Sequence, residues 1–213
     1  MLLGEAVAVL VAAYLAGSLS FAVIVSRAMG LSDPRSYGSG NPGATNVLRS
    51  GRRSAAALTL AGDALKGAIG TWLGAWAGAA GAGAALGVAP ESLAALGALA
   101  AFIGHLFPVF FGFRGGKGVA TFLGAMAALQ PWAGLACGLA WLAIALATRY
   151  SSAASLGSAL VAPVATWWLG LPPIAVASAA VMTALLFWRH RANIANLRAG
   201  RERRIGERAP GAS

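Results

Sequence analysis

Long apolar stretches alternate with short polar ones along the 213 residues of the chain. Seven of them are candidate membrane helices, over residues 2–25, 55–80, 92–107, 119–129, 133–148, 153–169 and 174–188. A helix that crosses a bilayer needs about 20 apolar residues, so the chain has room for several crossings and for no sizeable soluble domain. The pattern predicts an all-α fold, a polytopic seven-transmembrane-helix bundle in one domain over residues 1–213.

The breaks between the later stretches contain proline. Gln130-Pro131-Trp132 separates the fourth stretch from the fifth, and Leu171-Pro172-Pro173 separates the sixth from the seventh. Pro131 is also compatible with one long kinked helix, because proline removes a hydrogen bond from a helix interior. Gln130 and Trp132 favour a turn at the membrane interface instead.

Basic residues fall on one side of this predicted topology. With the N-terminus outside, seven crossings place on the cytoplasmic side residues 27–53, 114–117, Arg149 and 189–208. The opposite connections contain no Lys or Arg, at 81–91, 130–132 and 171–173. This asymmetry follows the positive-inside bias. It predicts a basic cytoplasmic tail over residues 198–213, whose end at 209–213 we expect to be disordered.

Composition supports a membrane class. Hydrophobic residues make up 58% of the chain and charged residues 10%, against about 25% charged in soluble domains. A net charge of +10 would suggest nucleic acid in a soluble protein, but no recognition motif accompanies it. The charges cluster at the ends of apolar stretches, where they meet anionic headgroups. We therefore expect membrane lipid as a partner and no nucleic acid.

The first polar segment, residues 38–46, has the chemistry of an anion site. Its glycines, Gly38, Gly40 and Gly43, permit positive φ and a close approach of backbone N–H groups to a ligand. Its hydrogen-bonding side chains are Ser39, Asn41, Thr45 and Asn46. Arg49, which follows, can clamp a phosphate bidentately. A helix-capping loop is the alternative, and the spacing matches neither a P-loop nor a dinucleotide fingerprint.

Two more polar segments share the predicted cytoplasmic face. In Gly115-Gly116-Lys117-Gly118, glycines beside a lysine at a helix start place N–H donors and an ammonium at one anion. His190 and Asn193 are one helical turn apart and can face the same site. Asp63 and Lys66, three residues apart inside an apolar stretch, predict a buried ion pair of structural role. Small residues at Gly70, Gly74 and Gly78 predict a close helix contact.

Several reaction types lack the residues they need. The chain has two histidines and six acidic residues, no His-x4-Asp acyltransferase motif, and no cluster with metal-ligand spacing. We therefore expect neither a metal nor another cofactor. Any reaction here relies on positioned donors, which suits a substrate that is already activated.

Together the polar segments resemble the PlsY family, bacterial membrane glycerol-3-phosphate acyltransferases that use acyl-phosphate. The matching segments span nearly the whole chain: 38–46 with Arg49, 63–67, 104–121, 149–152 and 190–206. The third motif departs from the family, with Ala192 where Glu is frequent and Ala195-Asn196 where a basic pair is usual. The resemblance implies a seven-helix enzyme of the cell inner membrane, with its active site on the cytoplasmic face.

The resemblance also implies a reaction, the transfer of an acyl chain from acyl-phosphate to the 1-hydroxyl of sn-glycerol-3-phosphate. Its products are lysophosphatidic acid and inorganic phosphate, in the first acylation of phospholipid synthesis. The expected catalytic residues are Ser39, Lys117, His190 and Asn193. The expected substrate-binding residues are Gly40, Asn41, Thr45, Asn46, Arg49, Gly115, Gly116 and Ser151. A transporter of a phosphorylated solute, or a structural subunit of a lipid-enzyme complex, remains an alternative.

Overall fold

The computed structural model describes residues 2–207, and every regular element within them is helical. The α-helices are α1 (Leu2–Gly17), α2 (Phe21–Ala28), α3 (Ala44–Val47), α4 (Arg53–Ala79), α5 (Pro90–Leu106), α6 (Val119–Leu129), α7 (Pro131–Thr148), α8 (Ser151–Trp168), α9 (Pro173–Arg189) and α10 (Arg191–Arg198). Three short 3-10 turns join them, η1 (Leu48–Ser50), η2 (Ala82–Leu86) and η3 (Val109–Phe111). The expected disorder of residues 209–213 concerns positions outside the described residues.

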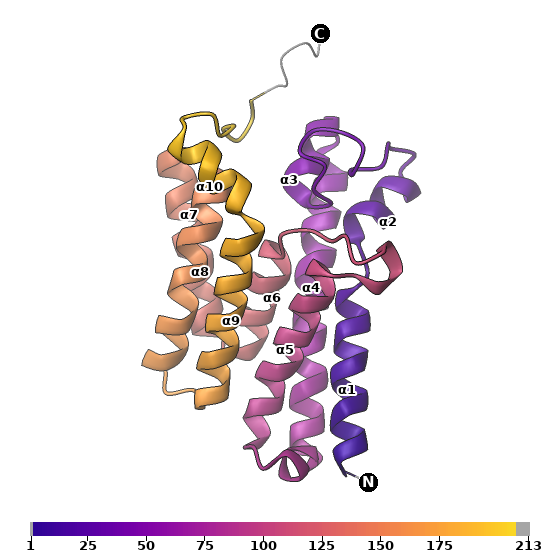
Figure 1. The fold of residues 1–213 in the computed structure, drawn as a ribbon, viewed down its shortest axis with the longest axis vertical. Helices are drawn as coiled ribbons and strands as arrows, with labels where there is room; N and C mark the ends of the chain where they lie inside the picture. Colours follow the sequence, from indigo (N-terminus) through magenta and orange to yellow (C-terminus); the bar gives the residue numbers. More distant parts are fainter. Residues whose placement is uncertain (1, 208–213) are drawn as a thin grey trace.

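The long helices run side by side in one bundle, with α4 near its middle (Figure 1). Helix α4 packs against α1, α5 and α6, while α7, α8 and α9 form a second group joined to the first through α6 and α5. Between the groups lies an apolar core that includes Phe102, Phe122, Met126, Met182 and Leu186. One end of the bundle carries α2, α3, α10 and the described part of the tail (Figure 1).

Six of the apolar stretches coincide with one helix each, within two residues at either end. The first stretch does not. The expectation of a single helix over residues 2–25 is wrong, because the chain leaves the helix at Ser18-Leu19-Ser20 and α1 and α2 meet at a bend of 45°. The break leaves the Leu19 carbonyl free of an intrahelical partner, and Lys66 Nζ donates to it at 2.6 Å.

The predicted ion pair between Asp63 and Lys66 is confirmed. Lys66 Nζ lies 2.8 Å from Asp63 Oδ1, and both side chains are buried. His105 Nδ1 lies 3.6 Å from the same oxygen and 3.1 Å from Thr121 Oγ1. An unpaired charge inside a helix bundle is costly, so the pair and the carbonyl at the helix break together stabilise the ammonium.

The predicted close helix contact is also confirmed, between α4 and α5. The backbone of α5 lies so near Gly74 and Gly78 that a Cβ atom at either position would overlap the carbonyl of Leu93 or Pro90. Gly70 faces Gly97 and Ala101 in the same way. Small residues thus let two backbones meet without intervening side chains, which maximises dispersion contacts in a membrane.

We expect Gly74→Ala to destabilise the bundle by about 1–3 kcal/mol, because a well-packed contact with backbone cannot yield to an added methyl group. Gly138→Ala in α7 is the matched control, since no atom lies within 4 Å of its added Cβ. A helical Gly→Ala change in open space favours the helix by about 1 kcal/mol. Thermal unfolding in detergent measures both, and equal unfolding temperatures for the two variants would contradict the packing argument.

Length and composition differ among the helices. Pro90–Phe111 and Pro131–Thr148 are long and apolar enough to cross a membrane by themselves. Two bent pairs pass the same test when each is counted as one span, α1 with α2 and α9 with α10, and α6 is a shorter apolar helix. The bundle therefore combines long apolar helices with shorter ones and with α4, which carries the interior ion pair.

Candidate functional site

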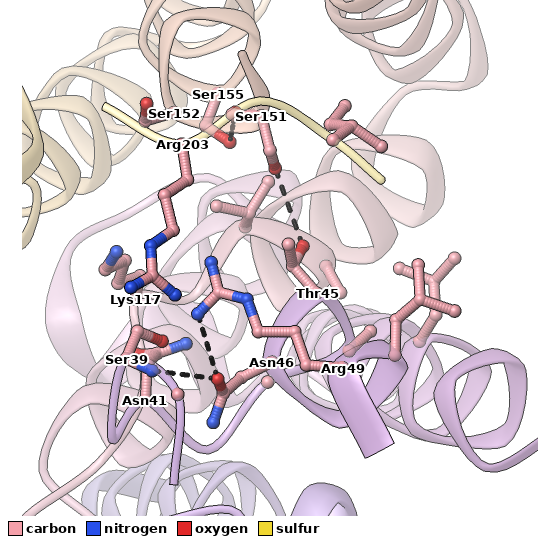
Figure 2. A pocket seen from close by; sticks show the side chains of 18 of the residues that line it. Ser39, Asn41, Thr45, Asn46, Arg49, Lys117, Ser151, Ser152, Ser155 and Arg203 are labelled. Atoms are coloured by element: carbon pink, nitrogen blue, oxygen red, sulfur yellow. Dashed lines mark hydrogen bonds between the residues drawn. The ribbon is translucent and has the colours of Figure 1, made fainter. Parts of the chain in front are cut away.

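A cleft of about 1410 Å³ lies where the three polar segments meet. Its walls come from residues 30–51, the start of α6, the start of α8, the end of α9 with α10, and residues 202–207 of the tail. Among the residues expected at the site, those that line it are Ser39, Asn41, Thr45, Asn46, Arg49, Lys117, Ser151, His190 and Asn193. Figure 2 shows many of these side chains converging from different helices and loops.

Asn46 organises the first polar segment. Its Oδ1 accepts hydrogen bonds from the Ser39 backbone N–H at 3.0 Å and from Arg49 at 3.1 Å (Figure 2). Its amide nitrogen donates to the carbonyls of Pro34 and Tyr37 at 2.6 and 3.1 Å. Asn46 is buried and its hydrogen-bonding groups are used within the protein. It therefore holds Arg49 and Ser39 in place instead of offering free groups to a ligand.

The glycines of this segment shape the loop. Gly38 and Gly40 have φ of +63° and +65°, as the sequence predicted, whereas Gly43 has φ of −156°. Gly43 does not use the freedom that glycine permits, because this residue is the extended N-cap of α3. The N–H of Gly40 donates to the Tyr37 carbonyl at 3.0 Å, and Gly40 does not line the cleft. Gly40 therefore forms the turn, and its expected contact with a substrate stays a prediction.

The second polar segment differs more from the expectation. The N–H groups of Gly115 and Gly116 donate to the carbonyls of Leu106 and His105, each at 3.2 Å. Arg189 in turn donates to both glycine carbonyls. Neither glycine lines the cleft, and both N–H groups have partners within the protein. Substrate binding by these glycines stays a prediction. The two glycines and Arg189 together fix the loop that carries Lys117.

Lys117 begins a chain of hydrogen bonds across the cleft. Its Nζ donates to Asn193 Oδ1 at 2.6 Å, and Asn193 Nδ2 donates to Glu202 Oε1 at 2.6 Å. The Ser152 hydroxyl donates to the same Glu202 oxygen at 2.7 Å. Burial lowers the pKa of Lys117, while Glu202 acts in the opposite direction. We missed one signal for Glu202, an acid directly between Arg201 and Arg203 in an otherwise basic tail.

His190 has a defined tautomer. It lies just beyond the end of α9, is 2% exposed, and its Nδ1 is 2.8 Å from the Leu186 carbonyl oxygen. Because a carbonyl only accepts hydrogen bonds, Nδ1 carries the proton and Nε2 is left as an acceptor. Burial, and then the nearby charge of Lys117, lowers the pKa of His190 to about 4. At neutral pH the site therefore holds an uncharged imidazole.

The first turn of α8 forms another wall. Thr45 Oγ1 lies 3.5 Å from Ser151 Oγ (Figure 2), and Ser151 is the first residue of α8. Tyr150, the N-cap, provides no side-chain hydrogen bond to the helix. The first N–H groups of a helix have no intrahelical partner and carry a positive partial charge. An anion at this wall would meet hydroxyl groups and a helix N-terminus.

The remaining wall is apolar. It is formed by Leu60 from α4, Val119 and Leu123 from α6, and Trp141 from α7. The Trp141 indole donates to Ser155 Oγ at 3.2 Å, which fixes its ring against α8. The cleft therefore suits an amphiphile with an anionic head. Within residues 2–207, no group of three or more His, Cys, Asp or Glu side chains is arranged to hold a metal ion.

Comparison with known proteins gives a consistent result. The family model described as glycerol-3-phosphate acyltransferase matches residues 7–200. A glycerol-3-phosphate acyltransferase of Thiobacillus denitrificans is 58% identical over 200 residues, which cover 93% of this chain and 96% of that protein. One of Paraburkholderia phymatum is 54% identical over 96% of this chain and 94% of its own length.

Solved structures are similar too. The chain superposes with a TM-score of 0.82 on a crystal structure of PlsY, an integral membrane glycerol 3-phosphate acyltransferase, in its glycerol 3-phosphate form. The two chains are 37% identical, and the match covers 94% of this chain and 96% of the other. A lysophosphatidic acid form of PlsY gives a TM-score of 0.80 at 36% identity, over 94% and 95% of the two chains.

Proposed function

Because the chain belongs to the glycerol-3-phosphate acyltransferase family, we propose that it transfers a fatty acyl chain from acyl-phosphate to the 1-hydroxyl of sn-glycerol-3-phosphate. The products are lysophosphatidic acid and inorganic phosphate. The related PlsY structures in glycerol 3-phosphate and lysophosphatidic acid forms support this acceptor and this product. The chain acts as a single integral-membrane domain without a cofactor.

The observation that carries the proposal is the two-sided character of the cleft. Arg49 and Lys117 line the same space as the apolar side chains of Leu123 and Trp141. Acyl-phosphate has an anionic head and a long apolar chain, and glycerol-3-phosphate is a small dianion. Cations provide charge-assisted hydrogen bonds to phosphate, while the apolar wall favours the burial of an acyl chain.

The chemistry requires little from the protein beyond positioning. The 1-hydroxyl oxygen attacks the acyl carbon, the bond from that carbon to the phosphate oxygen breaks, and inorganic phosphate leaves. An acyl-phosphate is a mixed anhydride, so its phosphate is a good leaving group and takes up the hydroxyl proton. Nε2 of neutral His190 accepts a hydrogen bond from the hydroxyl and orients it. Lys117 and Arg49 stabilise the phosphate as charge moves onto it.

A direct assay tests the proposal. Purified protein in detergent is incubated with acyl-phosphate and glycerol-3-phosphate, and the lipid products and released phosphate are quantified. We expect lysophosphatidic acid and phosphate in equal amounts, without a sealed compartment. The same protein with acyl-CoA as the donor serves as the comparison. Product formed with acyl-CoA but not with acyl-phosphate would overturn the proposed donor. The absence of any acylated product with either donor would overturn the proposed function.

We propose further that the chain crosses the inner membrane seven times with its N-terminus outside. In this arrangement the cleft faces the cytoplasm. Exposed tryptophans support the placement of one membrane interface, because Trp76, Trp132, Trp167 and Trp168 are 68–80% exposed. From the helix bounds, Trp76 lies near the end of α4, Trp132 at the start of α7, and Trp167 and Trp168 at the end of α8. Tryptophan is enriched at membrane interfaces, and basic residues are enriched on the cytoplasmic side.

Cysteine labelling from either side of the membrane checks this topology. Single cysteines at Gly51 and Ala199 should react with an impermeant reagent only when the cytoplasmic side is accessible. A cysteine at Gly170, in the turn between α8 and α9, should show the reverse pattern. The native Cys137 is buried and provides a low background. Labelling of Gly51→Cys or Ala199→Cys from outside would overturn the proposed orientation.

A further inference from the structure

The part of the tail from Gly200 to Glu207, here called the strap, folds back against the start of α8. The Ile205 N–H donates to the Arg149 carbonyl at 2.7 Å, and the Arg149 side chain donates to the Ile205 carbonyl at 3.1 Å. Closer to α10, Glu202 accepts hydrogen bonds from Ser152 and Asn193. The strap is therefore anchored on both sides of Arg203.

These two anchors direct Arg203 into the cleft. Figure 2 shows its side chain running from the strap toward Lys117 and Arg49, and Arg203 lines the cleft. The next residue, Arg204, is turned to Tyr150 and lies over that ring at 5.6 Å. Both arginines line the cleft, but they make different contacts: Arg204 is held over the Tyr150 ring, whereas Arg203 points toward Lys117 and Arg49.

The charges of the cleft are unbalanced. Within residues 2–207, carboxylate ion pairs involve Arg35, Lys66 and His105, and none involves Arg203, Arg49 or Lys117. The acids that line the cleft are Asp63, Glu202 and Glu207. Asp63 is paired with Lys66, and Glu202 Oε1 already accepts two hydrogen bonds. Burial, followed by the charge of Arg203, lowers the pKa of Arg49. Three cations at the edge of a membrane repel one another unless an anion lies among them.

We propose that Arg203 is a third phosphate-binding residue, and that the strap places it over a phosphate dianion held also by Arg49 and Lys117. The inference rests on the proposed function for the origin of that phosphate. Glycerol-3-phosphate and acyl-phosphate both carry the group, and inorganic phosphate retains it after transfer. The strap is thus part of the binding site, although it follows the last helix of the bundle.

Calorimetric binding to the purified full-length protein tests the proposal. Dissociation constants for glycerol-3-phosphate and for inorganic phosphate are measured with the wild type, Arg203→Gln, Arg203→Lys and Arg201→Gln. Arg201→Gln is the matched control, because this substitution removes the same charge from the same tail and Arg201 does not line the cleft. We expect Arg203→Gln to weaken binding of at least one ligand about tenfold or more, as loss of a charge-assisted hydrogen bond does.

The other two variants test whether binding depends on the guanidinium group and on its position in the cleft. Arg203→Lys should bind more weakly than the wild type, because an ammonium cannot reproduce bidentate contacts, and Arg201→Gln should stay within about twofold of the wild type because it lies outside the cleft. A loss for glycerol-3-phosphate alone assigns Arg203 to the acceptor's phosphate. A loss for inorganic phosphate alone assigns it to the donor's phosphate.

Several outcomes would overturn the inference. Equal dissociation constants for Arg203→Gln and Arg201→Gln with both ligands would do so, as would a wild type that binds neither ligand. Thermal unfolding without ligand checks that the variants are folded, and Arg203→Lys replaces Arg203→Gln if the latter is not. Binding that depends on Arg203 in a protein that transfers no acyl chain would support this inference and overturn the proposed function.

Discussion

Lys117→Ala is expected to lower kcat/KM for glycerol-3-phosphate by about 10–100-fold. A charge-assisted hydrogen bond contributes about 1.5–3 kcal/mol, which corresponds to this range. The change also removes the donor that holds Asn193 Oδ1. Arg49→Ala should have a similar effect, and Arg49→Lys should remain impaired because a point charge cannot bind phosphate bidentately.

Two exposed arginines provide controls for these variants. Arg114 lies three residues before Lys117 and Arg52 three residues after Arg49, and neither lines the cleft. Steady-state rates at varied glycerol-3-phosphate, with acyl-phosphate saturating, give KM and kcat for each variant. If Lys117→Ala and Arg49→Ala matched Arg114→Ala and Arg52→Ala in both constants, these side chains would only anchor the loops.

His190→Gln is expected to retain measurable turnover, with the larger loss in the KM for glycerol-3-phosphate. The imidazole offers Nε2 as an acceptor but is a weak base, because its pKa is lowered to about 4. Glutamine keeps a hydrogen-bonding group at the position. An indispensable general base would instead contribute roughly 10²–10⁴-fold to the rate. A loss of about a thousandfold or more in kcat would assign that role to His190.

The pH dependence of kcat provides a second readout. With its pKa near 4, His190 is neutral and accepts hydrogen bonds above that pH, and it becomes protonated only below it. The wild type should therefore show no fall in kcat that arises from His190 as the pH drops through 6.5, the ordinary pKa of histidine. A fall in kcat near pH 6 that the wild type and His190→Gln share belongs to the phosphate groups, whose second pKa is about 6. A fall in kcat that the wild type shows and His190→Gln lacks would contradict substrate-assisted transfer.

The apolar pattern was sufficient to predict the bundle. Ala and Leu recur in every stretch, and turns fall at Pro131 and Pro172-Pro173, because proline interrupts the hydrogen bonds of a helix. The pattern did not reveal the break at Ser18-Leu19-Ser20. At that break the Leu19 carbonyl accepts a hydrogen bond from Lys66, 47 residues away. A contact between residues so far apart in the chain cannot be predicted from the apolar pattern.

The residue types at the site could likewise be predicted, but several of their roles could not. Arginine, lysine and asparagine beside glycines indicated an anion site, because those side chains and free N–H groups are the donors that bind phosphate. Whether an N–H is free depends on which carbonyl lies opposite. In this structure the N–H groups of Gly115 and Gly116 donate to carbonyls at the end of α5.

The sequence by itself determined the helices, their order and the chemical character of the cleft, because apolar periodicity, proline and charge act over a few residues. Only the tertiary structure decided which donors point into the cleft, which tautomer His190 adopts, and that Glu202 and Arg203 belong to the site. Those outcomes depend on hydrogen bonds between residues far apart in the chain, from Lys117 to Asn193 and from Ser152 to Glu202. Such partners are chosen by packing, which places distant backbones within a few ångströms of each other.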